Sequence, residues 1–107
     1  MTELAKKTNL AIIGATGFLG REVLNALDES ELLIAEPLLL SVGEDVGEVL
    51  TCQGEDVLTK NLSDADFKNI TIALFCGSKE ITKKYAPIAM AAGAMVLDAS
   101  GGLDETS

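Results

Sequence analysis

Short runs of apolar residues, separated by polar and glycine-bearing segments, set the pattern of this chain. Such runs are typical of strands that are buried on both faces of a sheet. The sequence predicts strands at Leu10–Ile13, 38–42, 70–75 and 94–97. After the first of them, apolar residues recur at helical spacing and predict an amphipathic helix over 17–29. Its apolar face is expected to consist of Leu19, Val23, Leu24 and Leu27.

A second helix and a hairpin complete the predicted elements. Residues 79–92 predict a helix in which Pro87 is expected to introduce a kink and Gly93 a left-handed stop. Val49–Cys52 and 56–58 flank Gln53-Gly54-Glu55, a spacing that predicts a hairpin or bent strand pair at a sheet edge. Ser63-Asp64-Ala65-Asp66 offers capping oxygens for one helical turn.

This order of elements predicts an α/β fold with a Rossmann-like parallel sheet, helices on both of its faces, and an edge hairpin. Ligands of such sheets bind beyond the carboxyl ends of the strands. The segments that follow the predicted strands are therefore the candidate site, and they are 14–20, 41–47, 76–79 and 98–102.

The first of these segments, Gly14-Ala15-Thr16-Gly17-Phe18-Leu19-Gly20, follows a buried strand and opens a helix. In that context Gly14 permits a tight turn, Gly17 lets a pyrophosphate approach the backbone, and Gly20 allows the helix to lie close to the strand. The free amides and partial positive charge of a helix start favour an anion. The GxxGxxG spacing thus indicates dinucleotide binding, with a ligand-free tight turn as the alternative, and it specifies no reaction.

Many NAD-binding domains place an acidic residue at the end of the second strand, where it accepts hydrogen bonds from the ribose hydroxyls. Ser41 occupies that place here. A serine suits the 2′-phosphate of NADP, but the chain continues Val42-Gly43-Glu44-Asp45 where an arginine is expected, and two carboxylates repel a phosphate. A solvated acidic loop without any cofactor preference is the other interpretation, so NADP and NAD both stay open.

The remaining candidate residues have structural interpretations beside functional ones. Cys76 has no base nearby in the sequence, which favours a small buried residue over a nucleophile, and Cys52 is interpreted as packing. The amides that follow Gly77 and Ser78 either contact the nicotinamide side of a cofactor or belong to an ordinary helix start. Ser100 lies on the ligand side of the last predicted strand, or simply in a turn.

Composition and charge add exclusions. The 107 residues carry 8 basic and 17 acidic side chains, a formal net charge of −9, and 48% are apolar, which suits one small globular domain. With Arg21 as the single arginine, neither a nucleic acid nor an anionic membrane is an expected partner. The start of the chain resembles neither a signal peptide nor a spanning helix, so a cytoplasmic location is expected. Without histidine, these residues are expected to hold no Cys/His metal site and no catalytic imidazole.

Several segments beyond the glycine loop complete a recognisable pattern. The chain reads Ala-Ile-Ile-Gly-Ala-Thr-Gly-Phe-Leu-Gly-Arg-Glu-Val-Leu from Ala11, Lys-Tyr-Ala-Pro from Lys84, Ala-Ala-Gly-Ala from Ala91 and Val-Leu-Asp-Ala-Ser from Val96. Together with Ile72–Phe75, these segments resemble the N-terminal NADP-binding domain of the aspartate-semialdehyde dehydrogenase family over nearly all 107 residues.

The resemblance implies an oxidoreductase that reduces β-aspartyl phosphate to the semialdehyde with NADPH and releases phosphate, in amino-acid biosynthesis. It assigns Thr16, Gly17, Phe18 and Leu19 to the pyrophosphate loop, Ser41 to the 2′-phosphate, and Gly77 to a second cofactor-contacting loop. The family's catalytic cysteine, histidine and arginine follow later in its chains. Residues 1–107 are therefore expected to be a truncated, non-catalytic N-terminal dinucleotide-binding domain, whose parent is a homodimer formed through the missing C-terminal domain.

Departures from the family pattern keep two other interpretations open. In the family's Ser-x-Arg-Ser-Ala-Gly segment the arginine position holds Gly43, with one extra residue, and its Ser-Ala-Gly-Gly reads Cys-Gly-Ser-Lys from Cys76. These differences resemble the Usg-type paralogues, for which an association or regulatory role is the alternative. An extended short-chain dehydrogenase shares the glycine loop, but the residue four positions after Tyr85 is Ala89, so that family's Tyr-x-x-x-Lys pair is missing there.

Overall fold

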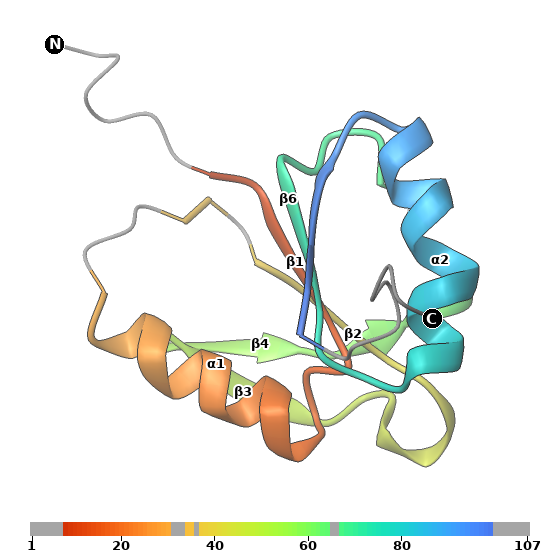
Figure 1. Ribbon diagram of the computed structural model, residues 1–107. Coiled ribbons are helices and arrows are strands. Elements are labelled where there is room, and N and C mark those ends of the chain that lie inside the picture. Colours follow the sequence, from red (N-terminus) through yellow and green to blue (C-terminus); the bar gives the residue numbers. More distant parts are fainter. Residues whose placement is uncertain (1–7, 31–33, 36, 65–66, 100–107) are drawn as a thin grey trace, which may run out of the picture.

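The computed structural model describes residues 8–30, 34–35, 37–64 and 67–99, and a five-stranded parallel sheet lies at the centre of this part of the chain (Figure 1). Its strands are β1 (Leu10–Ile13), β2 (Leu38–Ser41), β5 (Lys60–Asn61), β6 (Ile72–Phe75) and β7 (Met95–Asp98). Their order across the sheet is β5-β2-β1-β6-β7. The strands β1, β2 and β5 thus form one half of the sheet, and the chain then crosses over to add β6 and β7 on the other side of β1. This is the Rossmann strand order, and it confirms the predicted fold class.

The observed strand ends lie within two residues of the predicted ones. Apolar runs locate buried strands well because both faces of each strand need apolar side chains. The edge strand β5 is absent from the prediction. It consists of two exposed polar residues, which carry no hydrophobic pattern and pair in parallel with β2.

Helices cover both faces of the sheet, as predicted (Figure 1). On one face, Ile12 of β1 packs in a cluster with Leu24 of α1 (Phe18–Asp28). On the other face, Ile13 packs with Ala86 of α2 (Lys79–Ala91). Because successive strand residues point to opposite faces, the four residues of β1 supply both halves of the core.

The two helices differ from the predictions in detail. Leu19 was expected on the buried face of α1 but is 36% exposed, and Gly20 is buried against the preceding loop in its place. Helix α2 contains Pro87, as predicted, and ends at Ala91, one residue earlier than expected; Ser78 caps it, since its Oγ accepts a hydrogen bond from the Ile81 amide at 3.2 Å. Among the described residues, no helix is both long and apolar enough to cross a membrane.

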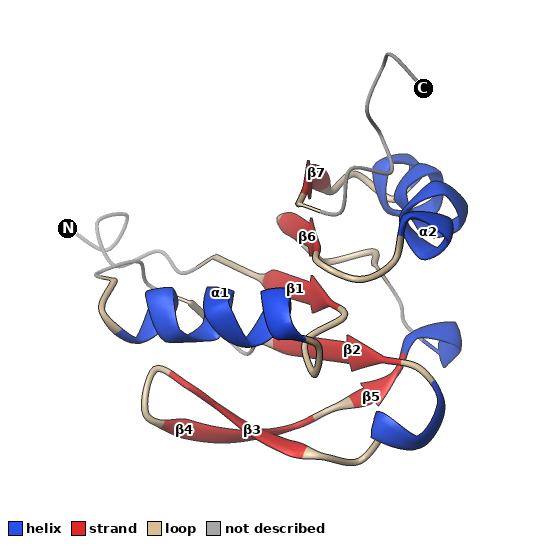
Figure 2. Ribbon diagram, turned by 60° about the horizontal axis from the view of Figure 1, so that its bottom comes forward, coloured by secondary structure: helices blue, strands red, loops and turns tan. Residues whose placement is uncertain are grey.

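The predicted hairpin is present as a two-stranded antiparallel sheet of its own (Figure 2). It consists of β3 (Val49–Cys52) and β4 (Glu55–Leu58). Gln53 and Gly54 both have positive φ, 51° and 85°, the conformation of a tight two-residue turn that matches the twist of the strands. Leu50 and Cys52 pack into the cluster beneath α1, so the hairpin lies against the α1 face while β5 forms the edge of the main sheet.

The one-turn helix predicted at 63–66 begins one residue earlier, as a 3-10 turn over Leu62–Asp64. Its capping oxygen belongs to Asn61, whose Oδ1 accepts a hydrogen bond from the Ser63 amide at 3.0 Å. Ala65 and Asp66 lie outside the described residues.

Candidate functional site

The candidate site lies where the strand order reverses, at the carboxyl ends of β1 and β6. Ile13 pairs with Phe75 of β6 on one side and with Leu40 of β2 on the other. Beyond these pairs the loop that follows β1 stays hydrogen-bonded to β2, because the Gly14 and Ala15 amides donate to the Leu40 carbonyl at 2.8 and 3.2 Å. Three of the predicted site segments, 14–20, 41–47 and 76–79, are thereby brought to one end of the sheet, which is where open α/β sheets bind ligands.

Two glycines of the first loop are required by the fold. Gly14 has φ +86°, and a Cβ there would lie 2.6 Å from the backbone nitrogen of Gly77 in the neighbouring loop. A Cβ on Gly20 would lie 2.3 Å from the Gly14 carbonyl oxygen. Both positions are therefore explained by close backbone packing, whether or not a ligand binds.

Gly17 is different, because nothing in the described part of the chain requires a glycine there. It is the N-cap of α1 with an ordinary extended conformation, φ −79° and ψ 177°, and a Cβ would make only a 3.6 Å contact with the Gly14 carbonyl oxygen. Having no side chain, Gly17 offers the first amides of α1 no capping oxygen. The helix start thus presents amide donors and bare backbone to an outside acceptor, whereas the start of α2 is capped by Ser78.

Side-chain contacts attach the acidic segment, defined as residues 43–48, to the glycine loop. Thr16 Oγ1 donates a hydrogen bond to Asp45 Oδ2 at 3.0 Å. Arg21 donates from Nε to the Thr16 carbonyl at 2.8 Å and pairs through Nη2 with Glu48 at 2.5 Å. These contacts hold the segment beside the glycine loop, while its carboxylate residues Glu44, Asp45 and Glu48 stay exposed, as expected of a solvated acidic loop.

A buried threonine holds the acidic segment from the other side. The hydroxyl of Thr59, which is 1% exposed, lies 2.8 Å from the Glu48 carbonyl and 3.1 Å from the Asp45 carbonyl, and it accepts a hydrogen bond from the Gly47 amide. Sequence reasoning missed Thr59, Arg21 and the Thr16–Asp45 contact. These residues are distant in sequence, and no local pattern indicates that they lie together.

Ser41 ends β2 between the glycine loop and the acidic segment. It is 5% exposed, and within the described residues its Oγ has no hydrogen-bond partner. A buried hydroxyl without a partner is costly, so such a group in a folded protein calls for an external donor or acceptor.

The loop between β6 and α2, residues 76–78, offers backbone rather than free side chains to the candidate site. The Ser78 side chain is engaged as the cap of α2, and Gly77 packs against Gly14. Burial, aided by the Asp98 carboxylate, raises the pKa of Cys76 to about 11, so this thiol stays protonated at neutral pH. A protonated, buried thiol is a poor nucleophile, in agreement with its interpretation as a packed residue. Ser100 lies outside the described residues.

These residues fit a dinucleotide. Bare backbone at Gly17 and an uncapped helix start suit a pyrophosphate, and the unpartnered Ser41 hydroxyl suits a ribose at the end of β2. Chemically, the site can bind and orient an anionic ligand. In the described part of the chain, no group of three or more potential metal-binding side chains gathers at it or elsewhere.

Comparison with known families matches residues 9–105 to the semialdehyde dehydrogenase, NAD binding domain. The chain is 41% identical over 98 residues to an aspartate-semialdehyde dehydrogenase of Rickettsia bellii, covering 91% of this chain and 29% of that protein. It is also 30% identical over 95 residues to a USG-1 protein homolog of Azotobacter vinelandii, covering 89% of this chain and 28% of that protein. The chain thus spans less than a third of the length of these relatives.

Solved structures show the same likeness. The chain superposes with a TM-score of 0.87 on aspartate semialdehyde dehydrogenase II from Vibrio cholerae, with 35% identity over 92% of this chain and 29% of that one. A probable aspartate-semialdehyde dehydrogenase from Pseudomonas aeruginosa gives a TM-score of 0.85 with 29% identity, over 91% of this chain and 29% of that one.

Proposed function

The chain belongs to the semialdehyde dehydrogenase family, in which it corresponds to the NAD-binding domain, and on that premise we propose which residues bind the dinucleotide. Residues 14–20 surround the pyrophosphate, with the amides that follow Gly17 as donors and Thr16, Phe18 and Leu19 along its path. Gly14 and Gly20 keep the loop close to the sheet. Ser41 contacts the adenosine ribose, and the Gly77–Ser78 backbone lies toward the nicotinamide.

The observation that carries this proposal is Gly17. Its conformation is open to any residue and its Cβ position is free, so packing does not explain why this residue lacks a side chain. The approach of a phosphate to the backbone does explain it. The uncapped amides beside Gly17 then act as hydrogen-bond donors, and the partial positive charge of the helix start adds to the attraction.

For the longer protein, we propose the reaction that the family resemblance implies, reduction of β-aspartyl phosphate to aspartate semialdehyde with release of phosphate, in the cytoplasm. The bound nicotinamide supplies the hydride. The residues of this chain bind the cofactor, fix its pyrophosphate at α1 and orient its two ends along the sheet. We also propose that the longer protein dimerises through regions outside this domain.

A second candidate is favoured by the USG-1 relatives together with the acidic segment, which differs from the arginine-bearing segment of the family pattern. In that case the domain keeps its fold for association or regulation. The two candidates are separated by assaying a protein that contains this chain for phosphate-dependent reduction of NAD(P)⁺ by aspartate semialdehyde. Turnover supports the enzyme, and its absence with intact dinucleotide binding supports the second candidate.

Binding is tested by titrating the 107-residue chain with NAD⁺ and NADP⁺ in a calorimeter, in the unaltered form and as Gly17→Thr. Threonine and glycine are comparable N-cap residues, so the variant is expected to keep its stability within a few tenths of a kcal/mol. Its Cβ and methyl group occupy the approach of the pyrophosphate, so affinity is expected to fall about tenfold or more.

The matched control is Asn25→Thr, which places the same side chain at an exposed position of α1. Asparagine and threonine have similar helix propensities, so this variant is expected to bind like the unaltered chain. Saturable binding that survives in Gly17→Thr would place the pyrophosphate elsewhere. Failure of both dinucleotides to bind the unaltered chain would refute dinucleotide binding by this domain.

A further inference from the structure

We infer that this domain discriminates against the 2′-phosphate of NADP and binds NAD in preference, with Asp45 as the residue that sets the preference. The inference rests on the proposed function, because it concerns the adenosine end of the same dinucleotide site. It departs from the expectation, implied by the family resemblance, that Ser41 serves a 2′-phosphate.

The first step is that the acidic segment is held in place. Asp45 accepts the 3.0 Å hydrogen bond from Thr16 Oγ1, so its carboxylate lies directly beside the glycine loop. Its backbone carbonyl is within 3.1 Å of the buried Thr59 hydroxyl. Asp45 is thus held through its side chain by Thr16 and through its backbone by Thr59, and both contacts favour a position beside the glycine loop.

The second step is the local charge. Residues 43–48 carry three carboxylates, Glu44, Asp45 and Glu48. The guanidinium that touches this segment, Arg21, is already engaged by Glu48 and by the Thr16 carbonyl. The acidic segment and Arg21 together therefore keep a net negative charge. A 2′-phosphate would bring up to about two further negative charges to this site.

The third step is the buried hydroxyl of Ser41. Its Oγ is without a partner in the described part of the chain and lies at the end of β2, where the acidic segment begins. A ribose hydroxyl is neutral and both donates and accepts hydrogen bonds. It can therefore satisfy Ser41 and donate to Asp45, which is the way acidic residues at the end of the second strand recognise NAD.

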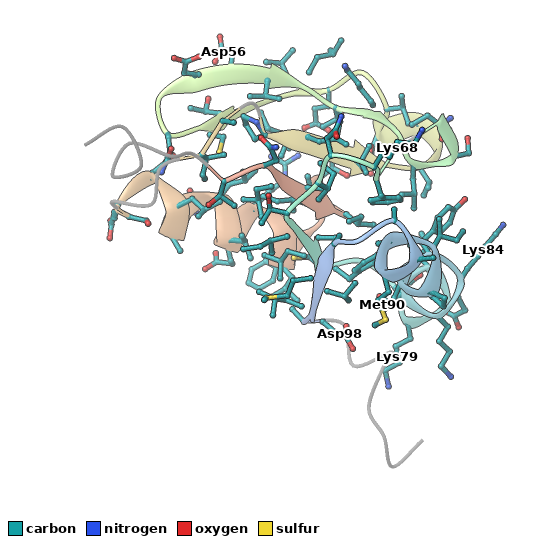
Figure 3. All side chains as sticks on the ribbon, turned by 90° about the horizontal axis from the view of Figure 1, so that it is seen from above. Asp56, Lys68, Lys79, Lys84, Met90 and Asp98 are labelled. Atoms are coloured by element: carbon teal, nitrogen blue, oxygen red, sulfur yellow. The ribbon has the colours of Figure 1, made fainter. Side chains whose placement is uncertain are left out.

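Two lysines, Lys60 and Lys84, have surroundings other than Ser41. Lys60 of β5 lines a cavity of about 510 Å³ together with Cys52 and Val57 beside the hairpin. Figure 3 shows Lys84 projecting outward from α2, where its Nζ lies 5.4 Å from the ring centre of Tyr85. Neither contact directs a cation toward Ser41.

The test is calorimetric titration of the 107-residue chain with NAD⁺ and with NADP⁺ at one low ionic strength. NAD⁺ is expected to bind about tenfold or more tightly, because like charges at a binding site strongly penalise the wrong ligand. In Asp45→Asn the amide oxygen still accepts from Thr16 while the charge is gone. The ratio of the two dissociation constants is expected to shrink several-fold, mainly through tighter NADP⁺ binding.

The control is Asp56→Asn, which removes the same charge from an exposed position on β4, where Asp56 pairs with Thr51 of the hairpin (Figure 3). It is expected to leave the ratio unchanged. Equal or tighter binding of NADP⁺ by the unaltered chain overturns the inference while leaving the proposed function intact. An equal response of Asp45→Asn and Asp56→Asn also overturns it, because overall charge would then be the cause. If neither dinucleotide binds, the proposed function itself fails.

Discussion

At the scale of single residues, the informative positions are those that the fold leaves unexplained. Gly14 and Gly20 are fixed by backbone packing, but Gly17 and the Ser41 hydroxyl have no structural reason in the described residues. An unsatisfied buried group destabilises the fold, and an unstrained N-cap accepts serine, threonine, asparagine or aspartate at least as well as glycine. Residues of this kind therefore point to a ligand more directly than the glycine spacing alone, which a ligand-free turn would also produce.

Two serines of the candidate site are expected to respond oppositely to alanine. Ser41→Ala removes a buried hydroxyl that has no partner in the described chain, so it is expected to stabilise the protein by about 1 kcal/mol and to weaken dinucleotide binding. Ser78→Ala removes the cap of α2 and is expected to destabilise by about 1 kcal/mol. Urea unfolding measures both changes. A loss of stability in Ser41→Ala would mean that its hydroxyl has a structural partner.

The buried thiol at position 76 predicts a loss of stability at alkaline pH. Burial, with the Asp98 carboxylate, raises its pKa from 9.0 to about 11 in the folded protein. Between these values the unfolded chain releases a proton that the folded chain retains, so the free energy of unfolding falls as pH rises through this window. Urea unfolding at about pH 8 and about pH 10 is expected to show a smaller alkaline loss in Cys76→Ala than in the unaltered chain.

The control for this pH dependence is Val23→Ala, which removes packing from the same apolar cluster without removing a titrating group. It is expected to lower stability at both pH values by similar amounts and to keep the alkaline loss of the unaltered chain. An undiminished alkaline loss in Cys76→Ala would assign the effect to other groups.

At the scale of elements, the sequence predicted the strands and turns that local residue patterns determine. β1 was located correctly because all four of its residues are buried, and the hairpin because Gln53-Gly54 permits its turn. The edge strand β5 was missed because two polar residues leave no periodic signal. The link between Thr16 and Asp45 was missed because it joins positions 29 apart, which only the assembled β2–β1 pair brings together. The candidate loop was thus predictable, and its fixed acidic neighbour was not.

The contact between the glycine loop and α1 predicts a sharp difference between two glycines. Gly20→Ala would place a Cβ 2.3 Å from a backbone oxygen that cannot move independently, so it is expected to destabilise by about 1–3 kcal/mol. Gly17→Thr, three residues away, is expected to change stability by a few tenths of a kcal/mol. Thermal unfolding of the two variants provides the comparison. Similar stabilities would show that α1 can shift away from the loop at little cost.

At the scale of the whole molecule, the arrangement of layers predicts where the structure opens first. β1 is paired on both sides, with β2 and β6, and lies between α1 and α2, so its amides are reached only by global unfolding. The hairpin is a sheet of two strands with exposed Val49 and Leu58. Leu50, Cys52 and Val57 pack beneath α1, and Gln53 in the turn donates hydrogen bonds to Asp28 and Leu27 at the end of that helix. A two-stranded hairpin has little stability of its own, so β3 and β4 are expected to open without the rest of the fold.

Native-state hydrogen exchange measured by NMR tests this order. The amides of β1 are expected to exchange slowest, and those of β3 and β4 about tenfold or more faster, because their opening costs less than global unfolding. Added NAD⁺ is expected to slow exchange in residues 43–48 together with the glycine loop, since Thr16 and Asp45 join them, and to leave the hairpin unchanged. Hairpin amides as slow as those of β1 would show one cooperative unit. Protection confined to the glycine loop would separate the acidic segment from the dinucleotide.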